Sequence, residues 1–135
     1  MAVNKAYDQY RENSVFTSSP EELTLMLYNG LIKFIMKGRQ AVEEKDIEEA
    51  NRCIIRAQEI ITEFRNTLDQ KFDISKSLDL IYDYMYRRLL EANIKKDGAI
   101  LDEVLGFAKQ LRDTWSEAMK IAKKNKNSGK SAINA

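Results

Sequence analysis

The side chains best suited to acid-base or nucleophilic chemistry are scarce in this sequence. The chain contains no histidine, which is the commonest general base and metal ligand in proteins, so no Ser-His or Cys-His arrangement can form. Its single cysteine, Cys53, has Arg52 and Arg56 nearby, and such cations can lower the pKa of a thiol. A small, half-buried residue at the edge of a helix seam explains the same pattern more simply.

The acidic pairs and the glycines also lack the spacing of known sites. A di-metal centre in a helical bundle needs inward-facing Glu-x-x-His pairs, whereas Glu43-Glu44 and Glu48-Glu49 fall at expected helix ends. Gly30 and Gly38 lie within one predicted helix, where close helix packing explains them better than a phosphate loop does. We expect no enzyme activity and no cofactor. A carrier or enzyme that uses buried carboxylates to bind a metal remains a rival, which metal analysis would test.

Composition favours a single globular domain. The 135 residues are 44% hydrophobic and 32% charged, and 22 basic residues against 21 acidic ones give a net charge of +1. This balance is not that of a nucleic-acid-binding protein, and the lysines near the C-terminus suit a solvated helix end. No run of about 18 apolar residues could span a membrane, and the first residues lack the apolar core of a signal peptide. We expect a cytoplasmic protein that does not insert into membranes.

Capping signals predict four helices. The first helix should begin at Ser19-Pro20, with Glu22 completing a capping box, and run to about Lys45. Asp46 with Glu49 repeats this signal at the second helix. The four expected capping residues are Ser19, Asp46, Asp73 and Asp97.

The apolar spacing fits helices that pack side by side. In the second helix, apolar residues step by three and four without a miss, at Ile47, Ala50, Ile54, Ala57, Ile61, Phe64 and Leu68. Short connections make successive helices antiparallel. The predicted fold class is all-α: an antiparallel up-down-up-down four-helix bundle over residues 19–124. An N-terminal arm, residues 1–18, and a disordered C-terminal tail, residues 125–135, lie outside it.

Two predicted helices are apolar on more than one side. The first carries a second stripe, which we expect something to cover: Leu25, Tyr28, Ile32 and Met36. The third carries apolar residues off its main stripe, including Tyr86 and Leu90. Exposed apolar patches often mark partner sites. The aromatic N-terminal arm could instead cover the second stripe as plain core, or as a lid that a partner displaces.

Short motifs along nearly the whole chain resemble those of the flagellin-specific export chaperones of bacteria. They run in order from about residue 4 to residue 120. The motifs are Tyr7-x-x-Tyr10, Asn13-Ser14-Val15, residues 18–23, residues 25–30, Leu68-Asp69, residues 80–85 with Arg88-Leu89, Glu91-Ala92-Asn93, Asp102-Glu103-Val104 and residues 111–115. Each motif is weak alone, but the ordered series is specific.

The resemblance implies a four-helix chaperone that holds the C-terminal segment of flagellin, prevents its premature polymerisation and delivers it to the flagellar type III export apparatus. It also implies an N-terminal segment that lies over part of the binding surface and moves when flagellin arrives. Components of the export apparatus would be further partners. The candidate contact residues are Tyr7, Tyr10, Val15, Leu25, Tyr28, Ile32, Met36, Tyr86, Leu90 and Asn93.

We expect Phe64, Leu111 and Trp115 to be plain core residues. Two alternatives remain open: a helical adaptor or regulatory module for another protein, and a homodimer formed through the apolar stripe. We expect the free protein to be a monomer or a weak dimer.

Overall fold

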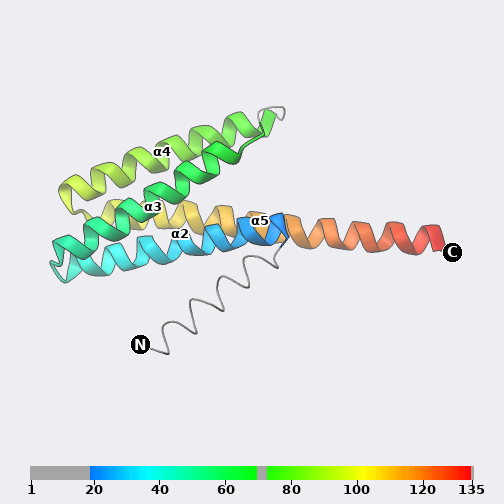
Figure 1. Ribbon diagram of the computed structural model, residues 1–135, viewed down its shortest axis with the longest axis horizontal. Helices are drawn as coiled ribbons and strands as arrows, with labels where there is room; N and C mark the ends of the chain where they lie inside the picture. The colour runs from blue at the N-terminus through cyan, green and yellow to red at the C-terminus, as the bar shows by residue number, and fades with distance from the viewer. Residues whose placement is uncertain (1–18, 70–72, 135) are drawn as a thin grey trace.

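The computed structural model describes residues 19–69 and 73–134, with side chains described as far as residue 127. This part of the chain forms four α-helices: α2 (Pro20–Glu43), α3 (Ile47–Thr67), α4 (Asp73–Lys95) and α5 (Gly98–Asn134). Helix α2 packs against α3 and α5, and α4 packs against the same two helices. Successive helices run in opposite directions (Figure 1). The predicted up-down-up-down bundle is therefore confirmed.

Helix starts follow the capping signals in most cases. The Ser19 hydroxyl accepts a hydrogen bond from the Glu22 backbone N–H at 3.2 Å, and the Asp46 carboxylate accepts one from Glu49 at 3.2 Å. At the start of α5, the Asp97 carboxylate accepts from the Ala99 backbone N–H at 2.9 Å. Each bond satisfies a donor that the first helical turn leaves unpaired. Asp73 differs from expectation because it is the first residue of α4 itself.

The core lies in the part of the bundle where all four helices are closely packed. Its fully buried members include Leu31, Ile54, Met85, Leu89 and Leu101. Gly38 allows α2 to approach α3 closely, because a Cβ there would meet Ile54 Cγ1 at 3.2 Å. Close helix packing therefore explains this glycine, as predicted.

Neighbouring helices cover part of the second stripe of α2. Helix α2 lies between α3 and α5, so a wide arc of its surface is buried. Tyr28 and Ile32 belong to the core, Leu25 is half-buried, and Met36 is 51% exposed.

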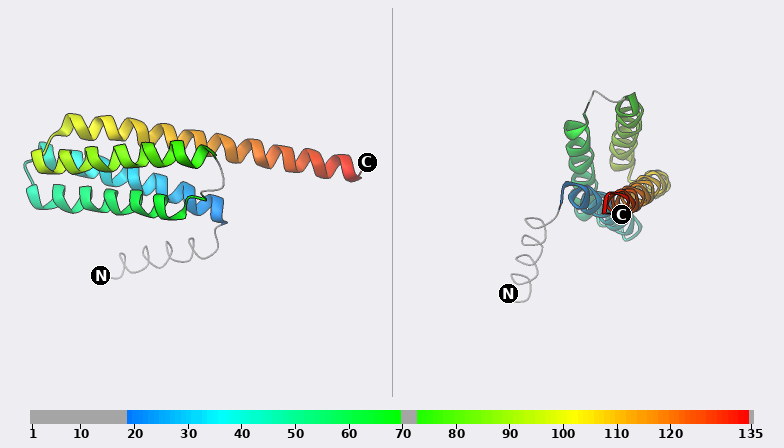
Figure 2. Two further views of the ribbon diagram at one scale, coloured as in Figure 1. Left: turned by 90° about the horizontal axis from the view of Figure 1, so that it is seen from above. Right: turned by 90° about the vertical axis from the view of Figure 1, so that its right-hand side faces the viewer.

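Helix α5 continues well past the ends of the other helices (Figures 1 and 2). Its helical backbone extends to Asn134, past Lys124, where we placed the end of the bundle. All described side chains from Lys120 to Asn127 are exposed. This extension therefore adds nothing to the core.

The bundle is open at the end where α2 begins. Figure 1 shows the end of α3 and the start of α4 diverging there from α2 and α5. Apolar residues at this end are accordingly less well covered, and Ile74 in the first turn of α4 is 67% exposed. Ile47, the first residue of the α3 seam, is 65% exposed at the opposite end.

Candidate partner-binding cleft

An apolar cleft of about 780 Å³ occupies the open end of the bundle. Side chains from all four helices line it, including Leu27 of α2, Leu68 after α3, Leu78 of α4 and Leu111 of α5. Its volume lies within the range of about 300–1,000 Å³ that is typical of ligand-binding pockets. A cleft of this size and lining can hold apolar side chains of another chain.

Three stacked aromatic rings form the floor of the cleft. The ring of Phe64 lies between those of Tyr28 and Tyr82, with centroid distances of 4.4 and 5.4 Å. The two tyrosine hydroxyls are hydrogen-bonded to each other at 2.6 Å. Burial raises the pKa of both tyrosines above the ordinary value of 10.0, so both hydroxyls are protonated near neutral pH. The pair satisfies its own polar groups and leaves an apolar surface facing the cleft.

Trp115 closes the side of the cleft between α2 and α5. Its indole Nε1 donates a hydrogen bond to the backbone carbonyl of Glu21 at 3.0 Å, while the ring remains partly exposed beside Ala118 and Thr114. Trp115 is the only tryptophan in the chain. Its indole therefore offers an optical signal located in the cleft.

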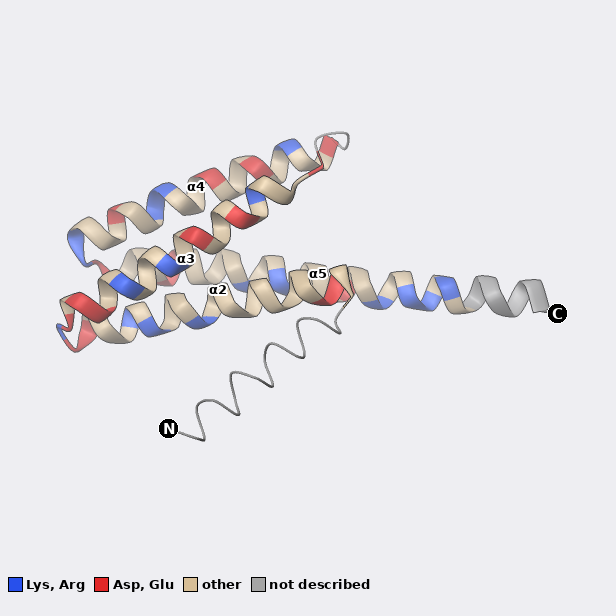
Figure 3. Cartoon of the chain, in the orientation of Figure 1, with Lys and Arg blue, Asp and Glu red and all other residues tan. Residues whose placement is uncertain are grey.

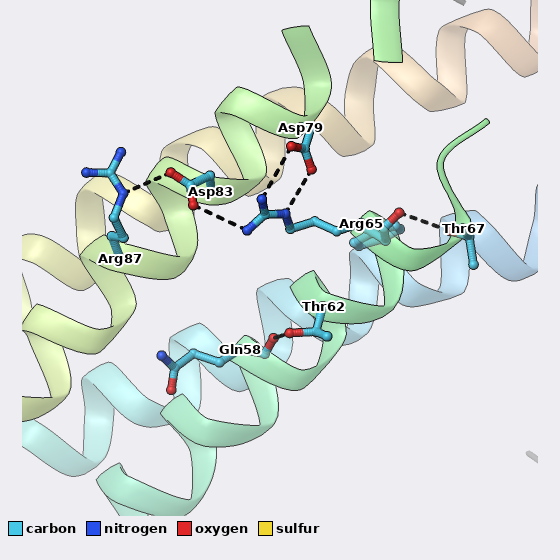
Figure 4. A network of polar contacts seen from close by, with 8 residues as sticks. Gln58, Thr62, Arg65, Thr67, Asp79, Asp83 and Arg87 are labelled. Carbon is cyan, nitrogen blue, oxygen red and sulfur yellow. Dashed lines mark hydrogen bonds and ion pairs between the residues drawn. The ribbon is translucent and has the colours of Figure 1, made fainter. Parts of the chain in front are cut away.

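Ion pairs join α3 and α4 outside the cleft, and none of the residues that form them lines it. The Arg65 guanidinium donates to Asp79 Oδ1 at 2.8 Å, to Asp79 Oδ2 at 3.3 Å and to Asp83 Oδ1 at 3.3 Å (Figure 4). Arg87 donates to the second oxygen of Asp83 at 2.9 Å. This forked pairing, chiefly the bond to Asp79, raises the pKa of Arg65. It fixes the two diverging helices relative to each other.

Charged groups within the cleft are acidic. Among the described lining residues, Glu63 and Asp69 carry charge and no lysine or arginine is present. The backbone carbonyl of Asp69 accepts a hydrogen bond from the Ser75 hydroxyl at 2.5 Å. This bond joins the segment after α3 to the first turn of α4.

The sequence-predicted contact residues do not gather at one place. Tyr28 lines the cleft at its floor, while Ile32 is buried deeper in the core. Leu25 and Met36 lie on α2 but do not line the cleft. Tyr7, Tyr10 and Val15 lie outside the described residues.

The other three predicted residues lie on an outer surface between α3 and α4. Tyr86 lines shallow depressions there with Ile55 and Thr62, and Leu90 is exposed. Asn93 donates a hydrogen bond to Asn51 Oδ1 across the two helices at 2.6 Å. This α3/α4 surface is separate from the cleft and much flatter.

Several cleft residues were predicted to be plain core instead. Phe64 is buried, as expected, but its ring also forms the cleft floor, and Leu111 and Trp115 are only partly buried and line its wall. Leu23, Leu27 and Ile74 also line the cleft. Apolar spacing marks a surface that needs covering, and it does not distinguish cover by a neighbouring helix from cover by a partner.

The surroundings of Cys53 do not favour a reactive thiol. Cys53 is fully buried, not half-buried, and its thiol donates to Glu49 Oε1 at 3.3 Å. Burial, with a smaller contribution from Glu49, raises the pKa of this thiol, despite Arg52 nearby. Over residues 19–69 and 73–134, no group of three or more His, Cys, Asp or Glu side chains is placed to hold a metal ion. In the same part of the chain, no helix combines the length and apolarity needed to cross a bilayer.

Known proteins are similar to this chain in sequence and in fold. A family model described as "Flagellar protein FliS" matches residues 3–122. The flagellar secretion chaperone FliS of Bacillus subtilis (strain 168) is 46% identical over 127 residues, which cover 94% of this chain and 96% of that protein. The protein of the same name from Salmonella typhimurium is 32% identical over 117 residues, covering 84% of this chain and 87% of that one.

A solved structure, described as a flagellar chaperone from bacteria, supports the same fold. It matches with a TM-score of 0.71 over 86% of this chain and 96% of its own, at 19% sequence identity. The family match extends over nearly the full length of the chain, and the curated relatives are secretion chaperones. The chain belongs to the FliS family of flagellar secretion chaperones.

Proposed function

We propose that this protein is a cytoplasmic export chaperone that binds the C-terminal segment of flagellin. In this role it prevents premature polymerisation of flagellin and aids its delivery to the flagellar type III export apparatus, whose components would be further partners. The apolar cleft at the open end of the bundle is the observation that carries the proposal. Its lining combines a rigid aromatic floor with partly covered aliphatic walls, a surface suited to the apolar face of a helix.

The physical mechanism is folding coupled to binding. A segment that is disordered before assembly loses conformational entropy when it becomes ordered on the chaperone, at a cost of roughly 2–5 kcal/mol. This cost weakens the complex relative to its contact area, so the cargo remains releasable. The chaperone itself supplies a preformed cleft, and the Arg65 ion pairs join α3 to α4, two of the helices that line it.

The α3/α4 surface provides a second place for a long segment to bind. Leu90 and Ile55 are exposed there beside Tyr86, which fits the sequence-based expectation for Tyr86, Leu90 and Asn93. A cargo that occupies the cleft can continue along α4 to this surface. The exposed Met36 and the half-buried Leu25 remain further candidate contacts on α2, and Tyr7, Tyr10 and Val15 are proposed contacts of the N-terminal arm.

Two exposed isoleucines give a matched test of the cleft. Ile74 lines the cleft in the first turn of α4, whereas Ile47 begins α3 at the opposite end of the bundle. Their exposed fractions, 67% and 65%, are nearly equal, so replacing either one costs little stability. Isothermal titration with the C-terminal segment of the host's flagellin should show one-to-one binding and a negative heat-capacity change.

We expect Ile74→Gln to weaken this binding about tenfold, as loss of an apolar contact within an interface does, and Ile47→Gln to leave it unchanged. Equal affinities for both variants would place the cargo elsewhere. Absence of binding by the folded wild-type protein would favour the alternative function, a helical adaptor or regulatory module with another protein partner. Sedimentation should show a monomer or a weak dimer in the free state.

A further inference from the structure

We infer that the part of α5 that extends beyond the bundle binds the surface of anionic phospholipid bilayers. This inference goes beyond the proposed function, because it concerns a surface outside the cargo cleft and a second kind of partner. The observation behind it is a cluster of exposed lysines on a helix segment that adds nothing to the core. Figure 3 shows basic residues along the described part of this extension and no acidic ones after Glu117.

The lysines give this segment a concentrated positive charge. Residues 118–135 contain five lysines and no acidic residue, so their formal charge is +5. With a net charge of +1 for the whole chain, residues 1–117 carry 1 − 5 = −4. No ion pair joins the described lysines of the extension to the described part of the chain. These exposed lysines are Lys120, Lys123, Lys124 and Lys126.

The end of the helix does not account for these lysines. From the sequence we expected a solvated helix end, where cations suit the helix dipole. The backbone of α5 instead continues to Asn134, and its last turn holds no basic residue. Lys126, the last of the described lysines, is eight residues before that end. Because the effect of the dipole falls off within the last turn, it does not stabilise Lys120 to Lys126.

The extension is an unfavourable helix on its own. Lys120 and Lys124 are four residues apart, and like charges at this spacing destabilise a helix. Gly129 and the asparagines of the extension have low helix propensity, and no burial compensates, because the described side chains from Lys120 to Asn127 are exposed. Negative groups along the lysine side would remove the repulsion. The helix therefore has a physical reason to bind a negatively charged surface.

The extension also has an uncharged side. At about 100° per residue, Lys120, Lys123 and Lys124 share one side of the helix. The uncharged side begins next to Lys124 with Ile121, whose side chain is 52% exposed, and continues with Ala122 and Asn125. A helix of this kind can lie along a bilayer surface, with its aliphatic residue toward the acyl chains and its lysine ammonium groups at the lipid phosphates. The contact is adsorption to the surface, not passage through the bilayer.

The choice of lysine favours a bilayer over a nucleic acid. Arginine suits carboxylates and phosphates held in a fixed geometry, and the bundle uses it in this way where Arg65 binds Asp79. The last arginine of the chain is Arg112, so the extension has only lysines. Lysine is a point charge on a flexible stem, which suits the mobile phosphates of an anionic membrane. A nucleic-acid backbone also gives Ile121 no apolar environment, whereas a bilayer accounts for both features.

Co-sedimentation of the full chain with lipid vesicles tests this inference. One kind of vesicle contains phosphatidylcholine alone, and the other contains phosphatidylcholine and phosphatidylglycerol at a ratio of about three to one. A DNA duplex of mixed sequence, at the same phosphate concentration, is the third probe. Each binding reaction is run at low and at high salt.

Two variants with the same net charge separate the extension from the rest of the chain. The extension variant combines Lys120→Gln, Lys123→Gln, Lys124→Gln and Lys126→Gln. The control variant changes four exposed lysines of the bundle that form no ion pair with the described residues: Lys37→Gln, Lys45→Gln, Lys76→Gln and Lys109→Gln. Because all eight side chains are exposed, both variants should keep the melting temperature of the wild type close to unchanged.

The wild-type protein should bind the vesicles with phosphatidylglycerol at low salt, bind those without it far more weakly, and be released at high salt. A lysine near an anionic membrane contributes about fivefold to binding, so the extension variant should bind at least about a hundredfold more weakly. The control variant should keep most of the affinity. Ile121→Gln should weaken binding several-fold, whereas Ile94→Gln, which changes a 75% exposed isoleucine at the end of α4, should not.

Three results would overturn the inference. They are equal binding to the two kinds of vesicle, equal losses in the extension and control variants, and tighter binding to the DNA duplex than to the anionic vesicles. The last result would assign the lysines to a nucleic acid instead. None of these measurements involves the cleft, so the proposed function stands or fails separately, by titration with the flagellin segment.

Discussion

At the residue scale, two buried tyrosines place their polar hydroxyl groups inside the apolar core. The hydroxyls of Tyr28 and Tyr82 satisfy each other at 2.6 Å, so removing one leaves the other buried without its partner. We predict that Tyr82→Phe lowers the free energy of unfolding by about 1–3 kcal/mol. The double variant Tyr28→Phe/Tyr82→Phe should lose less than the sum of the two single variants, because it removes both polar groups.

Urea denaturation of the three variants measures this coupling. A retained ring keeps the stack on Phe64 in each case, so the loss reports the hydroxyl pair alone. Strict additivity of the two single changes would show that the hydroxyls do not interact in solution.

Glu49 gives the chain a defined response to acid. Hydrogen bonds from Arg52 and then from the Cys53 thiol lower the pKa of this carboxyl from 4.5 to about 2. The folded state therefore favours the ionised form, and the unfolded state binds the proton first. The stability that Glu49 contributes should be fully present above about pH 4.5 and be lost as the pH falls toward 2.

Glu49→Gln should flatten the pH dependence of unfolding in that window. Glu48→Gln is the control, since Glu48 is exposed and forms no ion pair with the described part of the chain. Thermal melts from pH 2 to 6 provide the comparison. Identical pH profiles for wild type and Glu49→Gln would contradict the assigned interaction.

The pKa of Cys53 depends on packing as well as on its neighbours in the sequence. Arg52 and Arg56 beside Cys53 raised the idea of a lowered thiol pKa, but the thiol points into the bundle and donates to Glu49, so its pKa is raised. Arg52 does contact the thiol, with Nη2 donating to Cys53 Sγ at 3.7 Å, but burial and the bond to Glu49 outweigh its effect on the pKa.

At the element scale, two helices end in the same strained conformation. Lys45 after α2 and Lys96 after α4 have positive φ angles of 59° and 52°, a region that favours glycine. We predict that Lys45→Gly raises the free energy of unfolding by roughly 0.5–1 kcal/mol, because it relieves the contact between Cβ and the carbonyl group. Lys45→Ala removes the same charge but keeps Cβ, so it should bring no gain. Urea denaturation of both variants gives the two free energies of unfolding. An equal increase for Lys45→Gly and Lys45→Ala would show that the loss of charge, not the loss of Cβ, causes the effect.

Helix boundaries and core seams were largely predictable, because they depend on local signals. Ser19 and Asp46 cap helices through their own side chains, and the α3 seam follows the spacing of a packed helix from Ala50 to Phe64. The divergence of α3 and α4 was not predictable. Ile74 has the same apolar character whether a helix covers it or not, and only the relative tilt of the helices exposes it.

At the scale of the whole molecule, the chain is a closed bundle at one end and a cleft at the other. From the sequence we expected partner contacts on the second stripe of α2, on α4 and in the N-terminal arm, because a helix in a simple bundle needs only one apolar stripe. The neighbouring helices α3 and α5 bury Tyr28 and Ile32. The cleft lies at the end of the bundle where apolar residues of all four helices are not fully covered. The tertiary arrangement therefore adds Trp115 to the candidate contacts, and Met36 stays a prediction.

The central claim, that flagellin occupies this cleft, is tested most directly by the emission of Trp115. The only tryptophan of the chain lines the cleft, so titration with a tryptophan-free C-terminal flagellin segment reports occupancy without any mutation. We predict a saturable blue shift of the emission, with a midpoint equal to the affinity from calorimetry, because the bound segment shields the partly exposed indole from water. Unchanged Trp115 emission at ligand concentrations that saturate calorimetric binding would contradict the account.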